Sequence, residues 1–114
     1  MAYADVTGPT FATSTLGGYG TDSTTEGLYV PTDVWVDGSG DLLVLDTGNG
    51  ELDRYAYDAS SDAYSYDGDF LSGSRDTFAG TALSDPVALA GDGSDCYVLD
   101  SGNQRGVKLD LASG

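Results

Sequence analysis

The stretch DLLVLDTGN at residues 41–49 returns as DCYVLDSGN at residues 95–103. The match extends back to a proline in each copy. PTDVWVDGSG, which begins at Pro31, aligns with PVALAGDGS, which begins at Pro86. The second copy is one residue shorter in its turn, so the copies are spaced by 55 residues before the turn and by 54 after it. A period of this length indicates an array of one supersecondary unit, whose copies bury their apolar faces against one another.

Each copy has the pattern of short strands joined by tight turns. Residues 34–36 form a short apolar run, and the Asp-Gly pair after it is typical of hairpin turns. Residues 42–45 are continuously apolar, as in a strand that is covered on both faces. DTGNG is a second turn, and residues 52–57 alternate as a third strand. No segment has helical periodicity, so the sequence predicts an all-β chain.

The pattern P-x-x-V-x-V-D-G-x-G-x-L-x-V-x-D-T-G-N resembles the NHL repeat, the blade unit of a class of β-propellers. The second copy keeps the Asn-x-Arg that follows the glycine, at Asn103 and Arg105, whereas the first copy has Glu51 at the arginine position. The resemblance covers residues 17–111. It implies four-stranded blades in which the proline-led strand is innermost, and it says little about activity.

The resemblance implies one unit of two blades over residues 1–114. Blade one spans residues 27–71, and its strands are expected at 34–37, 42–45, 52–57 and 63–71. Blade two spans residues 82–114, lacks an outer strand, and has its strands at 87–90, 96–99 and 106–111. Residues 1–20 hold an orphan outer strand, at residues 3–16, that completes a blade of a neighbouring chain.

Two blades cannot close a ring alone, so we expect strand exchange between chains. Head-to-tail contacts that close give rings, and propellers have about 4–8 blades. NHL-like propellers are most often six-bladed, which implies a homotrimer that forms one propeller. The alternative is a piece of a longer six-bladed chain, which predicts that the reading frame continues beyond Gly114.

The charge balance is extreme, because 19 acids stand against four bases and give a net charge of −15. This field repels phosphate backbones, so we expect no nucleic-acid partner. The Asp-rich composition, with Lys108 as the only lysine, resembles that of proteins from halophilic archaea, where salt near 1 M and above screens charges beyond about 3 Å. An ordinary acidic protein is the alternative.

No apolar run reaches the length of a membrane span, so we expect no membrane insertion. The N-terminus has neither the basic nor the apolar region of a secretory signal. The cytoplasm of a halophile and a virion surface are the expected locations, and export by another route is the alternative. Cys96 is the only cysteine and takes the position of Leu42 in the repeat, so we expect a small core residue.

The sequence predicts neither catalysis nor a cofactor. The chain has no histidine, which excludes Ser-His-Asp and Cys-His arrangements and ordinary zinc sites. NHL-like propellers that act as lyases rely on metal-binding histidines, so the resemblance implies no lyase here. Carboxylate pairs are numerous, but no spacing singles one out.

The weak metal-ligand candidates lie in glycine turns. They are Asp37 and Asp41 in DGSGD, and Asp92 and Asp95 in DGSD. Both turns lack the longer run of oxygen ligands and the final glutamate of a calcium-binding loop, so we expect turn formation instead. The same interpretation applies to Asp67 and Asp69 in YDGDF.

The turns that repeat are expected to be structural. They comprise Asp46, Gly48 and Asn49 in the first copy, and Asp100, Gly102 and Asn103 in the second. A turn that every unit needs repeats for that reason alone, because short polar side chains bond back to local backbone.

The aromatic residues are weak ligand-binding candidates. Trp35, Tyr55, Tyr57, Tyr64 and Tyr66 could stack on sugar rings, as in propeller lectins. Trp35, however, lies between two valines in a predicted inner strand. The tyrosines lie on adjacent predicted strands, where cross-strand aromatic pairs stabilise a sheet by about 0.2–1 kcal/mol each.

These observations favour a non-enzymatic structural or interaction module. Its expected partners are copies of itself and another symmetric protein assembly. A small symmetric part of this kind suits the capsid or tail surface of a virus of a halophile. A carbohydrate-binding ring with a glycan as ligand is the alternative function.

Overall fold

The computed structural model describes residues 16–21, 27–68, 70–73 and 75–111. Within these ranges the chain consists of strands, turns and short 3-10 segments, and it has no α-helix. The predicted all-β class is therefore confirmed. No helix in this part of the chain is long and apolar enough to cross a membrane.

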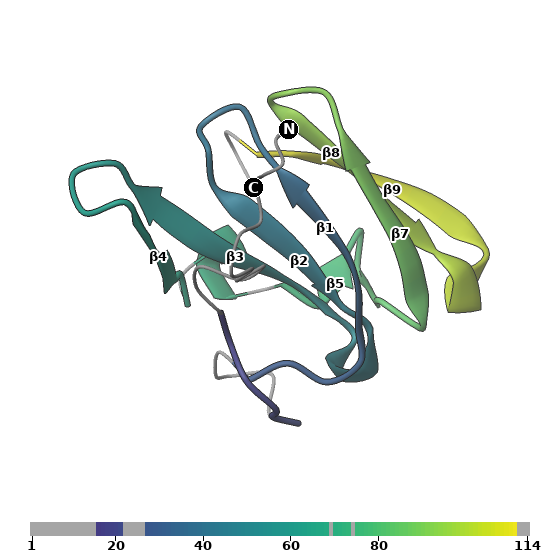
Figure 1. Cartoon of the computed structure of the whole chain (residues 1–114). Helices are drawn as coiled ribbons and strands as arrows, with labels where there is room; N and C mark the ends of the chain where they lie inside the picture. Colours follow the sequence, from purple (N-terminus) through teal and green to yellow (C-terminus); the bar gives the residue numbers. More distant parts are fainter. Residues whose placement is uncertain (1–15, 22–26, 69, 74, 112–114) are drawn as a thin grey trace, which may run out of the picture.

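Two antiparallel sheets contain most of the strands (Figure 1). The first sheet has the order β1 (Pro31–Val36), β2 (Leu42–Asp46), β3 (Glu51–Asp58) and β4 (Ala63–Tyr66). The second sheet has the order β7 (Pro86–Gly91), β8 (Asp95–Asp100) and β9 (Arg105–Asp110). Between them in sequence lies a hairpin of β5 (Thr77–Phe78) and β6 (Thr81–Ala82), which the sequence did not predict. The 3-10 segments are Thr47–Asn49, Phe70–Gly73 and Ser101–Asn103.

The two sheets repeat the same strand register. In the first sheet, Pro31 lies opposite Asp46 on the neighbouring strand, and the register shifts immediately after this proline. In the second sheet, Pro86 lies opposite Asp100, and the register shifts at the same position. Residues matched by the sequence repeat, with one deletion in the turn, therefore occupy equivalent places in the two sheets.

The predicted strand at residues 63–71 is wrong beyond Tyr66, where β4 ends. The chain turns there because Asp67 accepts hydrogen bonds from the Arg54 guanidinium, with a shortest distance of 2.6 Å, and Phe70 is buried in the core. The Arg54 guanidinium lies 4.6 Å from the centre of the Phe70 ring. The predicted orphan strand at residues 3–16 falls outside the described residues, except for Leu16.

The core lies between the two sheets. Leu43, Leu45 and Leu52 from the first sheet belong to one cluster with Leu89, Cys96, Val98 and Leu109 from the second, and Phe70, Phe78 and Leu83 extend it. Cys96 is completely buried, as expected from its place in the repeat, and burial raises the pKa of its thiol to about 12.

Polar contacts also join the sheets along the neighbouring strands β1 and β7. The Leu89 N–H donates to Asp33 Oδ2 at 2.8 Å, and Thr47 Oγ1 donates to the carbonyl of Pro86 at 2.7 Å. The hairpin turns are joined as well, because the Gly38 N–H donates to the Gly93 carbonyl at 3.1 Å.

Candidate functional site

The equivalent faces of the two sheets point in the same direction. Because the core lies between the sheets, the face that points toward the core in one sheet points away from it in the other. On the first sheet, the face toward the core carries Trp35, Leu43 and Leu45. On the second sheet, the residues equivalent to these lie on the face turned away from the core, and they are Ala90, Tyr97 and Leu99.

Burial differs sharply between equivalent positions. Leu45 is completely buried, whereas its equivalent Leu99 is 51% exposed. Conversely, Leu89 is 7% exposed, whereas its equivalent Val34 is 57% exposed. The other sheet packs against Leu45 and Leu89, whereas, within the described residues, no sheet packs against their exposed equivalents Leu99 and Val34. Each end of the stack therefore has an uncovered apolar region.

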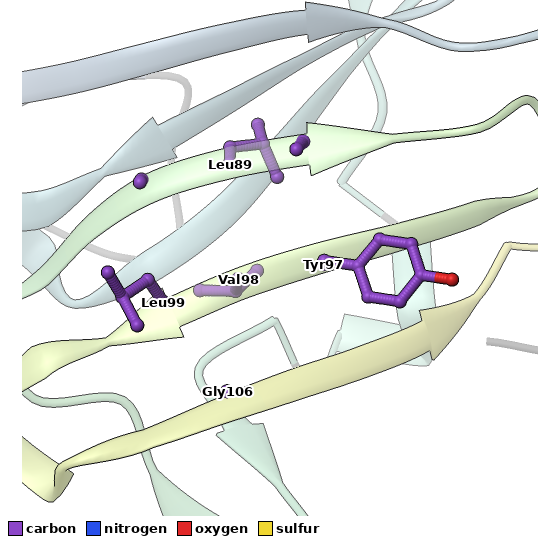
Figure 2. A pocket seen from close by; sticks show the side chains of 7 residues that line it. Leu89, Tyr97, Val98, Leu99 and Gly106 are labelled. Atoms are coloured by element: carbon purple, nitrogen blue, oxygen red, sulfur yellow. The ribbon is translucent and has the colours of Figure 1, made fainter.

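The uncovered region of the second sheet, here called the open face, comprises Ala88, Ala90, Tyr97, Leu99 and Gly106. It forms a shallow hollow whose lining is almost wholly apolar. Figure 2 shows Tyr97 and Leu99 projecting from β8 beside Gly106, which has no side chain to fill the space. Soluble monomers rarely expose large contiguous apolar patches, so this face is a candidate interaction surface.

The uncovered region of the first sheet is narrower and is here called the open strip. It consists of Val34 and Val36 on β1, and both side chains are more than half exposed. The rest of that face is covered, and Tyr55, for example, is buried with its hydroxyl close to Gly17 and the nearby Leu28.

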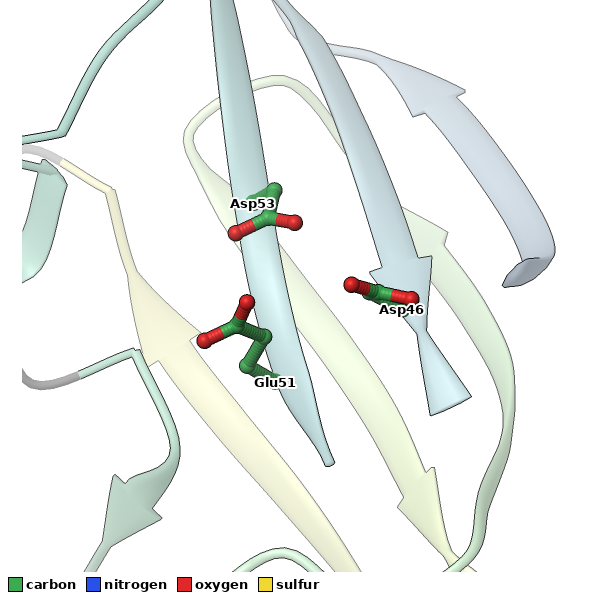
Figure 3. A group of neighbouring side chains, drawn as sticks. All are labelled: Asp46, Glu51 and Asp53. Atoms are coloured by element: carbon green, nitrogen blue, oxygen red, sulfur yellow. The ribbon is translucent and has the colours of Figure 1, made fainter. Parts of the chain in front are cut away.

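A second candidate lies in the covered part of the same face. Asp46 ends β2, and Glu51 and Asp53 lie on β3 directly across from Asp46 and Val44. All three carboxylates are buried, and one oxygen from each lies within 4.8 Å of the other two. Figure 3 shows the three side chains gathered over the adjoining ends of β2 and β3. We call this group the acidic cluster.

Arg75 is the cation beside the acidic cluster. Its Nε lies 3.2 Å from Asp53 Oδ1, and its terminal nitrogen lies 3.8 Å from Glu51 Oε2. Arg75 is itself buried, and its backbone carbonyl accepts a hydrogen bond from the Leu52 N–H, which holds it at the edge of β3. The cluster thus combines one positively charged guanidinium with three buried carboxylates.

Burial, and then the excess of negative charge, raises the pKa values in the cluster. Burial raises the pKa of Glu51 to about 8, and the neighbouring charge of Asp53 adds to the increase. Burial, followed by the charge of Asp46, raises the pKa of Asp53 to about 7. Burial also raises the pKa of Asp46, although hydrogen bonds from the Tyr29 N–H and Asn49 oppose the change.

The equivalent place in the second sheet is balanced. Arg105 stands where the first copy has Glu51, and its Nε donates to Asp100 Oδ2 at 2.7 Å. Burial alone would raise the pKa of Asp100, but hydrogen bonds from Asn103, the Ser84 N–H and Arg105 outweigh it, so the pKa is lowered.

The repeated turns make equivalent hydrogen bonds. In the first copy, the Tyr29 N–H donates to Asp46 Oδ1 and Asn49 donates to Asp46 Oδ2, both at 2.7 Å. A Cβ at Gly48 would collide with the carbonyl of Tyr29, which its N–H contacts at 2.7 Å. These bonds fasten the turn to the segment before the proline.

The second copy repeats the arrangement. The Ser84 N–H donates to Asp100 Oδ1, Asn103 donates to Asp100 Oδ2, and Gly102 lies against Ser84. In both copies, these hydrogen bonds hold the turn against the segment that precedes the proline.

The predicted metal-ligand candidates lie in turns and strand ends. Asp37 Oδ1 accepts from the N–H groups of Ser39 and Asp41 at 2.8 and 3.0 Å, which closes the turn. Asp41 Oδ1 accepts from the Tyr57 N–H at 2.9 Å.

In the second turn, Asp95 pairs with Lys108 at 3.2 Å, and the Asp92 N–H donates to the Asp95 carbonyl. Asp67 pairs with Arg54, and Asp69 lies outside the described residues. Within the described ranges, the structure does not bring these acids together into a three-carboxylate group.

The aromatic candidates contact one another or the core. Tyr55 lies across from Tyr66 with ring centres 5.7 Å apart, and Tyr57 lies across from Tyr64 at 5.1 Å. Trp35 packs on Gly91 of the second sheet, between the two sheets. Sugar binding by these residues stays a prediction.

Sequence reasoning missed Glu51, Asp53 and Arg75 as members of a site. A signal for the first two was present, because Glu51 replaces the arginine of the repeat and Asp53 follows it on the same face of a strand. Arg75 lies in no repeated motif, and only the folded chain brings it to the cluster.

A scan against protein-family models finds no match to this chain, and a search of curated proteins finds no significant match either. The open face, the open strip and the acidic cluster are therefore the features from which we infer a function.

Proposed function

We propose that the chain is a non-enzymatic structural module that assembles head to tail with copies of itself. The open face of one chain docks on the open strip of the next, in the way that the first sheet packs on the second within a chain. The observation that carries this proposal is the contrast between Leu45, fully buried, and its equivalent Leu99, 51% exposed. The internal packing supplies the template for the contact between chains.

Side-chain sizes support this docking. Within the chain, the large Trp35 packs on Gly91, where a Cβ would overlap the indole. At the proposed contact, the equivalent of Trp35 is the small Ala90, and the equivalent of Gly91 is Val36. The Ala90–Val36 pair is smaller than the Trp35–Gly91 pair. Tyr97, which lies opposite Ala90, is larger than its equivalent Leu43 and offsets most of this difference, as close packing requires.

A contact between two different surfaces is heterologous and gives a closed ring or an open filament. We propose a closed ring of three chains, in which each sheet is a propeller blade and the ring has six blades. β9 is an edge strand of its sheet and is the natural acceptor for an outer strand from a neighbour. Strand exchange of this kind removes an edge and strengthens the ring.

The acidic surface indicates the conditions of assembly. A chain with a charge of −15 repels its copies unless salt screens the charges, so the ring belongs to a salt-rich environment. A ring that repeats one surface around an axis suits attachment to another symmetric assembly, such as the capsid or tail of a virus of a halophile.

The test is the molar mass in solution, by light scattering on a sizing column at about 3 M and about 0.1 M salt. We expect three times the chain mass of 11.7 kDa in high salt and dissociation in low salt. Leu99→Asp should give monomers in high salt, because it places a charge in the contact. Ala79→Asp, in the exposed turn between β5 and β6, is the control that adds the same charge and should keep the trimer.

A wild-type monomer in high salt would refute the ring. A trimer that persists in Leu99→Asp would show that the chains associate through another surface.

A further inference from the structure

We propose that Asp46, Glu51 and Asp53 bind one hard divalent cation, of the size of calcium, between the ends of β2 and β3. This site is distinct from the weak candidates in the hairpin turns, and it does not depend on ring formation.

The first observation is a set of buried carboxylate oxygens without donors. Glu51 is 1% exposed and Asp53 is completely buried. Each turns one oxygen toward Arg75, Oε2 in Glu51 and Oδ1 in Asp53. The other oxygens, Glu51 Oε1 and Asp53 Oδ2, accept no hydrogen bond. A buried ionised oxygen without a partner is costly, so these atoms require a proton or a cation.

The second observation is that the fold does not need these acids. In the second sheet the position of Glu51 is taken by Arg105, and the position of Asp53 is taken by Val107. That sheet forms the same strands and the same turn with an arginine and an apolar residue. The first copy therefore carries two additional carboxylates beside Asp46 that the turn itself does not require.

Charge and geometry suit a calcium-sized ion. Three carboxylates and the Arg75 guanidinium sum to two negative charges, which one divalent cation neutralises. One carboxylate oxygen from each of the three residues lies within 4.8 Å of the other two. Calcium binds oxygens at about 2.3–2.6 Å, so opposite ligands lie about 4.6–5.2 Å apart, whereas magnesium requires a tighter octahedron. The all-oxygen donor set selects hard cations over zinc and copper.

Tyr66 lies beside Arg75, the cation of the acidic cluster. Its hydroxyl is buried and has no hydrogen-bond partner, and Arg75 lies 5.6 Å from the centre of its ring. Burial, and then the charge of Asp53, raises the pKa of this hydroxyl to about 12. A neutral hydroxyl can complete the coordination of a calcium ion, and the ring is a nearby donor for sensitised terbium luminescence.

The experiment uses the full chain, stripped of metal by a chelator and kept in high KCl. Terbium is titrated with tyrosine excitation, calcium then competes for the site, and Tm is measured with and without calcium. The test variants are Glu51→Gln and Asp53→Asn. Asp92→Asn, which removes one charge from an exposed turn, is the matched control.

We expect the wild type and Asp92→Asn to bind one ion and to gain thermal stability with calcium, since a ligand that binds only the folded state raises Tm. Glu51→Gln and Asp53→Asn should bind at least about tenfold more weakly, because ligand charge sets affinity. Metal-free Glu51→Gln should be no less stable than the metal-free wild type, which separates loss of the site from loss of the fold.

Two results would overturn the proposal. Equal calcium responses in all four proteins would show diffuse association with the acidic surface. No calcium response in the wild type would show that protons alone neutralise the cluster.

Discussion

The indole of Trp35 lies directly on the backbone of Gly91, at the place that any side chain of residue 91 would occupy. Trp35 belongs to β1 and Gly91 ends β7, so this contact joins the two sheets. It also shows why the two copies of the repeat differ here. Each position is adapted to the partner sheet that it meets and not to its own place in the repeat.

Gly91→Val should therefore destabilise the chain, because its side chain overlaps the indole. We expect a loss of about 1–3 kcal/mol in the free energy of unfolding, as in other overpacked cores. Combining it with Trp35→Ala should recover part of the loss, since the pair then matches Ala90 and Val36. Denaturant unfolding in high salt measures both changes, and a Gly91→Val variant as stable as the wild type would contradict the prediction.

The proposed head-to-tail contact predicts complementation between two defective chains. Val36→Asp spoils the open strip, and Leu99→Asp spoils the open face, so each variant alone should be monomeric. Mixed together, they retain one intact contact, the open face of the Val36→Asp chain on the open strip of the Leu99→Asp chain. Light scattering should show a dimer of two different chains. An interface that is symmetric between copies would give no such rescue.

Arg105→Gln should weaken the second sheet. The Arg105 side chain donates to Asp100 Oδ2 at 2.7 Å, to the Phe78 carbonyl at 3.0 Å and to the Thr81 carbonyl at 2.9 Å. Removing this charge leaves buried Asp100 with fewer donors, so we expect a loss of about 1–3 kcal/mol and a higher pKa for Asp100.

The control for Arg105→Gln is Lys108→Gln, which removes an exposed ion pair with Asp95. That change should cost less than about 1 kcal/mol. Equal losses in the free energy of unfolding would show that the Arg105–Asp100 pair stabilises the chain no more than the exposed pair does.

Without metal, the acidic cluster should make stability fall as the pH rises. The pKa values of Glu51 and Asp53 in the folded chain are about 8 and about 7, against ordinary values near 4. The folded state therefore binds more protons than the unfolded state between these limits. The stabilisation is complete below about pH 4 and is lost as the pH rises through 7 and 8.

Thermal unfolding in a chelator, as a function of pH, measures this effect. Glu51→Gln should flatten the slope between about pH 5 and 7 by up to about 1.4 kcal/mol per pH unit, the value for one proton. Saturating calcium should flatten the wild-type curve in the same way. If Tm changed with pH in the same way in the wild type and in Glu51→Gln, the group that titrates would be a residue other than Glu51.

Much of the local structure could be predicted from the sequence. β1, β2 and β3 overlap the segments predicted as strands, because alternation and turn residues act over a few positions. The turn at Asp46 was also recognisable, since its repetition at Asp100 marks a structural need. The end of β4 was not predictable, because it depends on Asp67 meeting Arg54 across the hairpin.

The acidic cluster shows most clearly which features could not be predicted from the sequence. The sequence marks Glu51 as a departure from the repeat, but exposed acids are common in a chain with this charge. Only the pairing of β2 with β3, and the return of the chain to bring Arg75 beside them, turns three ordinary acids into a buried group. Burial is a property of the packed structure, and it sets the energy of a charge.

The all-β class, the repeating unit and its turns could be predicted from the residues alone, because these features follow from short-range periodicity and backbone chemistry. Tertiary structure alone decided which copy of each apolar residue is covered. Leu45 and Leu99 are the same residue in the same place of the repeat, and one is buried while the other is exposed. The reason is that a repeat specifies a surface, whereas burial requires a neighbour to cover it.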